Sequence, residues 1–252
     1  MEKILKIVAT SAACLAFFLC GPAVSGEFSV NPIRLEFNPT TKSGVIGIKN
    51  EGSTKLGFQV QAMEWTQDAA GNDQYAVTSE LIFFPKIMSV EPGEDGIIRV
   101  GIRNTVVATE KTYRLFIEEL PGPSQTPEAR GAQISMLVRF GAPIFVTPMK
   151  PQDNLELEGL EFVKGVLTFT AKNTGNRHQV VQGIQLKGSD TRGNEVYSLT
   201  LADRYLLTGT TKSYTTTIAA DQCAKIASLA IEFRTDKRSV PRKLDITRAM
   251  CS

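Results

Sequence analysis

The sequence predicts an all-β protein built from two β-sandwich domains in tandem. Short runs rich in β-branched and aromatic residues recur along the chain, and clusters of Gly, Pro and Asn separate them. Helical periodicity is scarce by comparison. Without a leader of 26 residues, 252 − 26 = 226 residues remain. That length suits two domains of about 100 residues, each large enough to bury its own core.

Residues 1–26 are predicted to be a cleavable signal peptide. A basic start is followed by an apolar run over residues 7–19 and then by small residues. The apolar run is too short to cross a bilayer comfortably. We expect export, with cleavage after Ser25 or Gly26. Lipoprotein cleavage before Cys20 is the alternative, but the leucine that precedes it is bulkier than such sites usually take.

The charge of the chain gives no sign of a polyanionic partner. The full sequence has 28 basic and 26 acidic residues, and the leader removes two lysines and one glutamate, which leaves 26 against 25. The basic residues are spread along the chain and form no run. We therefore expect no binding to nucleic acid.

Seven candidate strands occupy the first half of the chain. They cover residues 28–37, 44–49, 56–65, 81–89, 97–103, 113–120 and 133–147. Turn-forming sequences such as the Glu-Pro-Gly-Glu of residues 91–94 separate them. Within 56–65 apolar residues alternate with others until Glu64 and Trp65, where we expect the strand to end. Seven strands of this kind favour an immunoglobulin-like sandwich.

A Pro-rich segment over residues 147–151 predicts the inter-domain linker, because its two prolines remove two backbone donors. The domains are therefore expected at residues 27–147 and 148–252. Candidate strands of the second domain cover residues 160–163, 166–172, 180–186, 196–201, 212–218, 228–233 and 243–247. They predict a second immunoglobulin-like sandwich.

The mature chain keeps two of the four cysteines, Cys223 and Cys251, and we expect them to form one disulfide. The bridge would close a loop of 251 − 223 = 28 residues. On the chain-entropy model it stabilises the fold by about 3–4 kcal/mol. The wide spacing is unlike that of redox-active pairs.

The chemistry of common enzymes is scarce in this chain. Its one histidine, His178, lies in a turn-like stretch and is interpreted as a loop residue. Nucleophilic triads and ordinary zinc sites would lack ligands, and no glycine-rich phosphate loop is present. We expect a binding protein, not an enzyme, with no metal and no cofactor. Carboxylate pairs are defined by separation in space, which the sequence does not reveal.

The strand over residues 133–147 begins with an alternating apolar row, formed by Ile134, Met136, Val138 and Phe140. An internal sandwich strand with one face in its own core is the ordinary interpretation. A long Pro-rich loop over residues 121–131 precedes it, however, and would leave the beginning of the strand free to extend beyond its sheet. Such a strand could be lent to another protein.

Several segments, in order and spacing, resemble the periplasmic pilus-assembly chaperones of the PapD-like family. They are residues 31–35 (NPIRL), 64–67 (EWTQ), 84–86 (FPK), 90–93 (VEPG), 98–100 (IRV), 113–121 (YRLFIEELP) and 143–146 (PIFV). The longest of these is the most specific. Residues 173–176 and 205–209 add weaker similarity in the second domain. The Pro-rich loop and the last strand are most similar to the archaic chaperone-usher branch.

The resemblance implies donor-strand complementation, in which the chaperone fills the open groove of an incomplete pilin domain with its own strand. Ile134, Met136, Val138 and Phe140 would form the donor strand. Burying the side chains of Ile134, Met136 and Val138 would contribute about 1.5–3 kcal/mol each before ordering costs. The resemblance also implies a boomerang-like arrangement of the two domains, and periplasmic localisation.

The family also implies a basic anchor for the terminal carboxylate of the subunit. Arg34 falls at the position of the first-strand arginine of the family. Pro143 stands where the better-known members have a lysine, so Arg139 is a candidate for the second basic residue, provided that no bulge intervenes at Gly141. The ordinary alternative for Arg34 is a solvated charge on an edge strand.

The implied partners are pilin or fimbrial subunits and an outer-membrane usher, with no insertion into the membrane. A second hypothesis is that the chain is itself a structural pilus subunit or adhesin with tandem immunoglobulin-like domains. Against it, a pilin needs a donor extension before its first strand, and strand signals here begin at Phe28, directly after the leader. The sequence leaves open whether the free protein self-associates.

Overall fold

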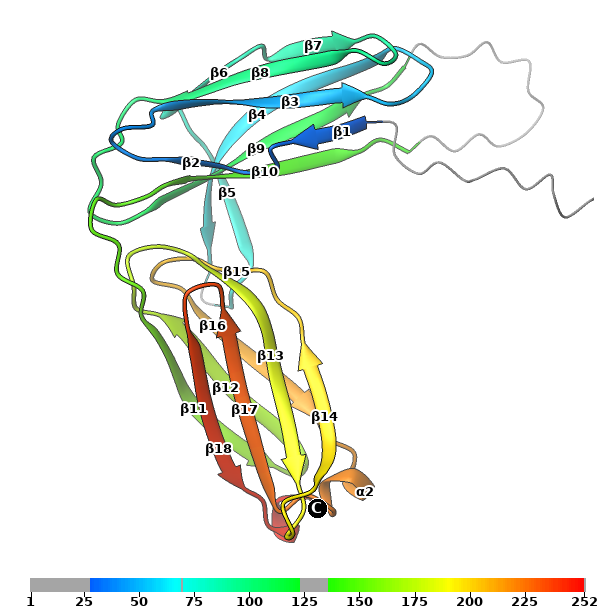
Figure 1. Cartoon of the computed structure of the whole chain (residues 1–252), viewed down its shortest axis with the longest axis vertical. Coiled ribbons are helices and arrows are strands. Elements are labelled where there is room, and N and C mark those ends of the chain that lie inside the picture. The colour runs from blue at the N-terminus through cyan, green and yellow to red at the C-terminus, as the bar shows by residue number, and fades with distance from the viewer. Residues whose placement is uncertain (1–27, 69, 123–135, 252) are drawn as a thin grey trace, which may run out of the picture.

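The computed structural model describes residues 28–68, 70–122 and 136–251. Two β-sandwiches stand at an angle to each other, in the expected boomerang-like arrangement (Figure 1). The all-β prediction is confirmed, since the helical elements are only α2 (Ala220–Cys223) and the 3₁₀ turn η2 (Arg248–Cys251) in the described part of the chain. No helix within it is long and apolar enough to cross a membrane. The predicted signal peptide and Ile134 lie outside the described residues.

The first sandwich consists of two sheets. One has the strand order β1 (Phe28–Asn31), β3 (Ser43–Asn50), β8 (Asp95–Ile102) and β6 (Leu81–Phe84). The other has the order β2 (Leu35–Phe37), β10 (Arg139–Val146), β9 (Lys111–Leu120), β4 (Leu56–Gln67) and β5 (Asp73–Val77), and β7 (Ile87–Val90) also pairs with β4. Neighbouring strands are antiparallel except for β2 and β10, which run parallel.

Alternating side chains of the two sheets form the first core. Ile46 and Ile48 of β3 and Ile98 of β8 face Ile117 of β9 and Ile144 of β10, and all are fully buried. Successive residues of a strand point to opposite faces, so the same alternation presents a second set of side chains on the outer face of each sheet.

The second sandwich repeats the architecture. One sheet has the order β11 (Leu155–Val163), β12 (Val166–Asn173) and β16 (Thr211–Thr217). The other has the order β14 (Glu195–Leu201), β13 (Gln179–Ser189), β17 (Ser228–Thr235) and β18 (Ser239–Asp245), with β15 (Tyr205–Leu206) pairing with β13. Its core forms a separate cluster from that of the first sandwich. The division at residue 147 stays a prediction.

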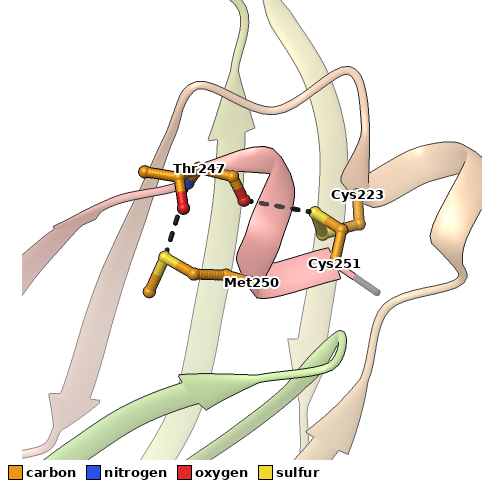
Figure 2. Close-up of a disulfide and its surroundings, with 4 residues drawn as sticks. All are labelled: Cys223, Thr247, Met250 and Cys251. Atoms are coloured by element: carbon orange, nitrogen blue, oxygen red, sulfur yellow. Dashed lines mark hydrogen bonds between the residues drawn. A yellow bond between two sulfur atoms is a disulfide. The ribbon is translucent and has the colours of Figure 1, made fainter.

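A disulfide joins Cys223 of α2 to Cys251 of η2, as predicted (Figure 2). The two Cα atoms are 5.7 Å apart, a usual separation for a disulfide. The sulfur of Met250 accepts a hydrogen bond from the backbone N–H of Thr247, and the Met250 carbonyl accepts one from Gly165. The bridge and these bonds hold the end of the chain against the second sandwich.

Two predicted strands are each divided between the sheets of the first sandwich. The strand predicted over residues 28–37 is split into β1 and β2, and the one predicted over 81–89 is split into β6 and β7. A proline, Pro32 or Pro85, lies at each break. Proline has no N–H for the ladder, so the chain leaves one sheet there and enters the other.

The predicted end of β4 at Glu64 and Trp65 is wrong, because the strand continues to Gln67. Trp65 lies on the outer face of its sheet and is nevertheless fully buried, because the second sandwich covers it. The short strands β5 and β15 were not predicted. The exposed side chains of β5 give no apolar alternation for a sequence pattern to detect.

Candidate functional site: an arginine-lined cavity between the sandwiches

A cavity of about 490 Å³ lies between the outer face of the β10–β9–β4 sheet and the second sandwich. Four arginines of the described residues line it: Arg34, Arg114, Arg139 and Arg204. No acidic side chain lines it among the residues that the structure describes. Guanidinium groups form paired hydrogen bonds to carboxylates, so this cavity suits an anionic group.

The pairing of β9 with β10 places Arg114 and Arg139 on the same face of the sheet, toward the cavity. Arg139 is opposite Glu118, and Gly141 is opposite Phe116. The register is regular over the whole of β10, so the bulge considered at Gly141 is absent. Arg139 therefore points to the cavity, where its guanidinium lies over the ring of Phe116 at 4.0 Å.

Gly141 leaves room for the aromatic wall of the cavity. A Cβ atom at this position would come within 3.0 Å of the Phe116 ring. The carbonyl of Gly141 also accepts a hydrogen bond from Nη1 of Arg114, at 2.9 Å. This residue thus orients one arginine and admits the ring on which another is stacked.

Arg34 lies between β1 and β2 and reaches the same cavity, so the structure brings together the two basic residues named from the sequence. Its guanidinium is 3.3 Å from Glu36, and both side chains are about half exposed. An ion pair as exposed as this is worth about 0–1 kcal/mol. Arg34 therefore keeps most of its capacity to bind an anion.

Sequence reasoning missed Arg114, the most enclosed arginine of the cavity. It lies opposite Pro143, and Pro143 is the residue that stands where the resemblance implied a lysine. Its side chain is only 12% exposed and stacks on the Trp65 ring at 3.9 Å. Its Nε is buried with no hydrogen-bond partner among the described residues. The alternation of Arg114, Phe116 and Glu118 along β9 was the available signal.

Tyr75 and Asp73, on β5, border this arginine. Burial raises the pKa of Tyr75, and the charge of Asp73 raises it further. Its hydroxyl therefore stays protonated and donates to the Asp73 carboxylate at 3.2 Å. Asp73 is also 3.8 Å from Arg114, a long contact that neutralises the guanidinium only in part. No group of three or more metal-ligating side chains occurs within the described ranges.

The model of the Pili and flagellar-assembly chaperone PapD N-terminal domain matches residues 27–152, half of the chain. The chain belongs to this chaperone family. No relative is found among curated protein sequences. The archaic branch suggested by the sequence stays a prediction.

Solved structures of pilus chaperones share the fold of this chaperone over both sandwiches. A chain of the CsuC–CsuE chaperone–tip adhesion subunit complex of Acinetobacter baumannii is 18% identical, over 86% of this chain and 98% of that chain, with a TM-score of 0.59. The Salmonella enterica SafA pilin–SafB chaperone complex is 10% identical, over 89% of this chain and 99% of that chain, with a TM-score of 0.57. The Pseudomonas aeruginosa CupB2 chaperone is 15% identical, over 87% of this chain and 100% of that chain, with a TM-score of 0.53.

The apolar row expected to form the donor strand divides at the beginning of β10. Met136 and Val138 precede this strand and are 84% and 41% exposed. Phe140 is inside it and packs against the first core of the chaperone. The predicted strand over 133–147 thus begins at Arg139 within the described part, although the Val138 carbonyl still accepts a hydrogen bond from Glu119.

The junction between the sandwiches holds the cavity in shape. Trp65, Phe145 and Leu207 form a small buried cluster of their own. The side-chain amide of Gln67 donates to the Tyr205 carbonyl and accepts from the Leu207 N–H, both at 3.0 Å. Strand β4 of one sandwich is thereby bonded to the β15 segment of the other.

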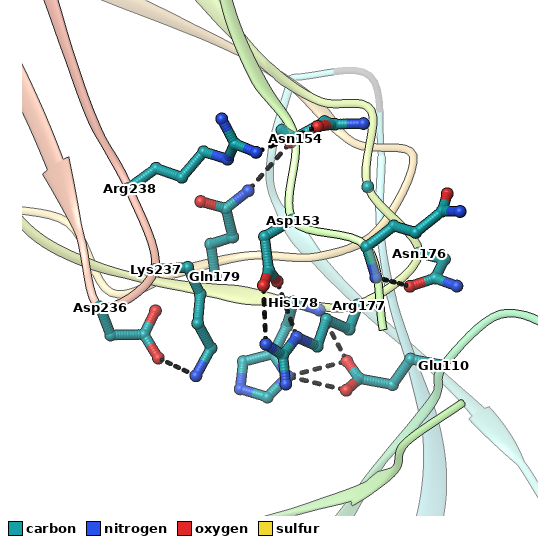
Figure 3. A network of polar contacts seen from close by, with 12 residues as sticks. Glu110, Asp153, Asn154, Asn176, Arg177, His178, Gln179, Asp236, Lys237 and Arg238 are labelled. Carbon is teal, nitrogen blue, oxygen red and sulfur yellow. Dashed lines mark hydrogen bonds and ion pairs between the residues drawn. The ribbon is translucent and has the colours of Figure 1, made fainter. Parts of the chain in front are cut away.

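His178 contributes to the same junction (Figure 3). It does lie in the loop before β13, as predicted, but only 5% of it is exposed. Its Nδ1 is 2.8 Å from the Glu110 carboxylate of the first sandwich, and its ring stacks on Phe145 at 3.6 Å. The backbone N–H of His178 donates to Glu110 as well. This histidine therefore joins the two sandwiches.

Proposed function

We propose that this chaperone binds pilus subunits by donor-strand complementation in the periplasm and delivers them to an outer-membrane usher. One observation carries the proposal: an unpaired strand edge leads directly to the arginine-lined cavity. β10 pairs with β9 along its whole length, but with β2 only at residues 144–146. Over residues 139–143 its other edge has no strand partner in the described part of the chain.

This open edge, residues 139–143, suits the addition of a strand from a subunit. Unpaired N–H and C=O groups of an edge strand readily bond to another chain. The exposed side chains of Met136 and Val138 precede the edge, and Ile134 extends their row in the sequence. We propose that these three fill the subunit groove, each contributing about 1.5–3 kcal/mol before ordering costs.

The cavity is the proposed anchor of the terminal carboxylate of the subunit. A subunit strand paired to the open edge could place its end between Arg34, Arg114 and Arg139. Hydrogen bonds to charged groups contribute about 1.5–3 kcal/mol when shielded, and less where the arginine is half exposed. We therefore assign the largest contribution to Arg114 and smaller ones to Arg34 and Arg139.

The opposite sheet of the first sandwich is the proposed contact for the usher. Its outer face carries four exposed apolar side chains around Arg99, namely Val45, Ile82, Phe84 and Ile97. This face also borders a shallow groove lined by Lys42 and Arg99. A partner bound there would leave the open edge of β10 occupied by the subunit, as delivery requires.

The alternative of a pilus subunit finds no support in the fold. β10 completes the first sandwich with Ala142, Ile144 and Val146, so the core that the described residues form lacks no strand. The matched family is one of chaperones and not a class of enzymes. We propose that binding proceeds without a cofactor.

Co-purification with co-expressed pilin subunits tests the lent segment. The variant Ile134→Asp, Met136→Asp, Val138→Asp should lose its subunit, because charged side chains cannot enter an apolar groove. Val163→Asp, which replaces an exposed valine on the second sandwich, should retain it. Retention by the triple variant, with its folding checked by circular dichroism, would contradict the proposal.

Arginine variants test the anchor in the same assay. Arg114→Ala should abolish stable subunit binding and Arg34→Ala should weaken it, whereas the control Arg192→Ala, an exposed arginine of the β13–β14 turn, should bind normally. Loss of folding in Arg34→Ala would make that residue structural. Normal binding by folded forms of both cavity variants would reject the anchor.

A further inference from the structure

Arg204 is the one cavity arginine contributed by the second sandwich, and the assigned anchor does not use it. The other three arginines each have a carboxylate within 4 Å, at Glu36, Asp73 and Glu118. Arg204 has none among the described residues, and its side chain is exposed. It is the least compensated positive charge of the cavity.

The carboxylate next to Arg204 is engaged elsewhere. Asp203 accepts hydrogen bonds from Lys212 at 2.9 Å and from the Tyr214 hydroxyl at 2.6 Å. It also accepts from the backbone N–H of Arg204, at 2.7 Å. These bonds orient Asp203 toward its own sandwich, so it fixes the Arg204 backbone without pairing with the guanidinium.

The position of Arg204 opposite the first sandwich is held rigidly. The next residue, Tyr205, is bonded through its carbonyl to Gln67. Its ring packs edge-on against Trp65, with centroids 5.3 Å apart, and lies 5.7 Å from the Arg114 guanidinium. Arg204 is therefore presented to the cavity by a segment that is bonded to the opposite wall.

The cavity has more hydrogen-bond donors than the oxygens of one carboxylate can satisfy. A carboxylate has two oxygens and about four acceptor positions, which two guanidinium groups can fill with paired bonds. The first sandwich alone supplies three guanidinium groups. If the ligand carries a single carboxylate, the fourth guanidinium, that of Arg204 on the facing wall, is left without an acceptor.

We infer that the cavity binds two anionic groups of one chain, and that Arg204 binds an Asp or Glu side chain near the C-terminus of the subunit. The inference rests on the proposed function, since the terminal carboxylate is the first of the two groups. It assigns to the second sandwich a part in selecting among subunits. Subunits without an acidic residue at that distance from the C-terminus would bind more weakly.

Calorimetry of the full mature chain with short acetylated peptides tests the assignment. The peptides contain Thr and Val, end in a free carboxylate or an amide, and carry Asp or Asn at one of the positions before the last residue. We expect the best Asp peptide to bind about two- to fivefold more tightly than its Asn counterpart. Arg204→Gln should remove this difference, and the control Arg192→Gln should keep it.

The outcomes separate the inference from the proposed function. A preference for carboxylate over amide without any preference for Asp would overturn the inference and leave the anchor intact. An Asp preference that persists in Arg204→Gln would assign the second group to another residue and also overturn it. Arg34→Gln should weaken all carboxylate peptides equally and keep the Asp preference. Equal affinity for carboxylate and amide, or no binding of any peptide, would overturn both.

Discussion

The two ends of β10 differ in almost every physical respect. At its C-terminal end, Ile144 and Val146 are fully buried and the strand is paired on both sides. At its N-terminal end, Arg139 is exposed, and the strand is paired on one side in the described structure. A single strand thus belongs to the core at one end and offers an unpaired edge at the other.

This contrast shows how a chaperone keeps an adhesive edge without losing its own fold. Exposed edges favour aggregation, and proteins usually cover them. Here the buried end is held by the junction cluster around Phe145, so the open end keeps its place beside the cavity. The stability of the protein and its binding capacity are therefore expected to respond to mutations at different ends of the strand.

The largest effect is expected from Phe145→Ala at the buried end. Removing a fully buried phenylalanine that contacts Trp65 and His178 should lower the free energy of unfolding by about 3–5 kcal/mol. Urea unfolding followed by the fluorescence of the single tryptophan measures it. Phe84→Ala, at a phenylalanine that is 72% exposed, is the control and should cost far less. Equal losses of unfolding free energy in the two variants would contradict the expected difference between the buried and the exposed phenylalanine.

The next largest effect is expected from Glu110→Ala. The substitution leaves the backbone N–H and Nδ1 of buried His178 without their acceptor, which should cost about 1–3 kcal/mol. Small-angle scattering should also show a wider spread of angles between the sandwiches. Glu94→Ala, at an exposed turn, should change neither quantity. A variant with unchanged stability and scattering would mean that other contacts alone hold the junction.

A smaller effect on stability is expected from Gly141→Ala, near the middle of β10. The Phe116 ring can move toward the cavity to admit the new methyl group, so the loss should stay below about 1 kcal/mol. The displaced ring narrows the cavity, and peptides ending in a carboxylate should bind more weakly in calorimetry. Unchanged affinity would show that Phe116 does not shape the binding site.

The smallest effect on stability is expected at the open end. Met136→Ala and Val138→Ala remove exposed side chains and should change the free energy of unfolding by less than about 0.5 kcal/mol. The same variants should retain less subunit in co-purification. A large loss of stability would place these side chains in the core of the chaperone and contradict their assignment to the lent segment.

Sequence patterns predicted much of the fold but only part of the site. Period-two alternation identified most strands, and the two mature cysteines predicted the disulfide that forms. Arg34 was named from its motif position, and Arg139 was named as a substitute because Pro143 stands where a lysine was implied; both line the cavity. Arg114 was present in a quoted motif without being recognised, because the residue opposite it across a strand pair is unknown until the register is known.

By itself, the sequence determined what depends on neighbours along the chain. Alternation sets which face of β9 or β10 is buried, and Pro32 and Pro85 interrupt strands because they lack a donor. Only the tertiary structure decided what depends on separation in space. Trp65 is buried because a second sandwich covers it, and Arg204 lines the same cavity as Arg114 because Gln67 bonds the two sandwiches together. Contacts between residues about 90–140 positions apart leave no local pattern in the chain.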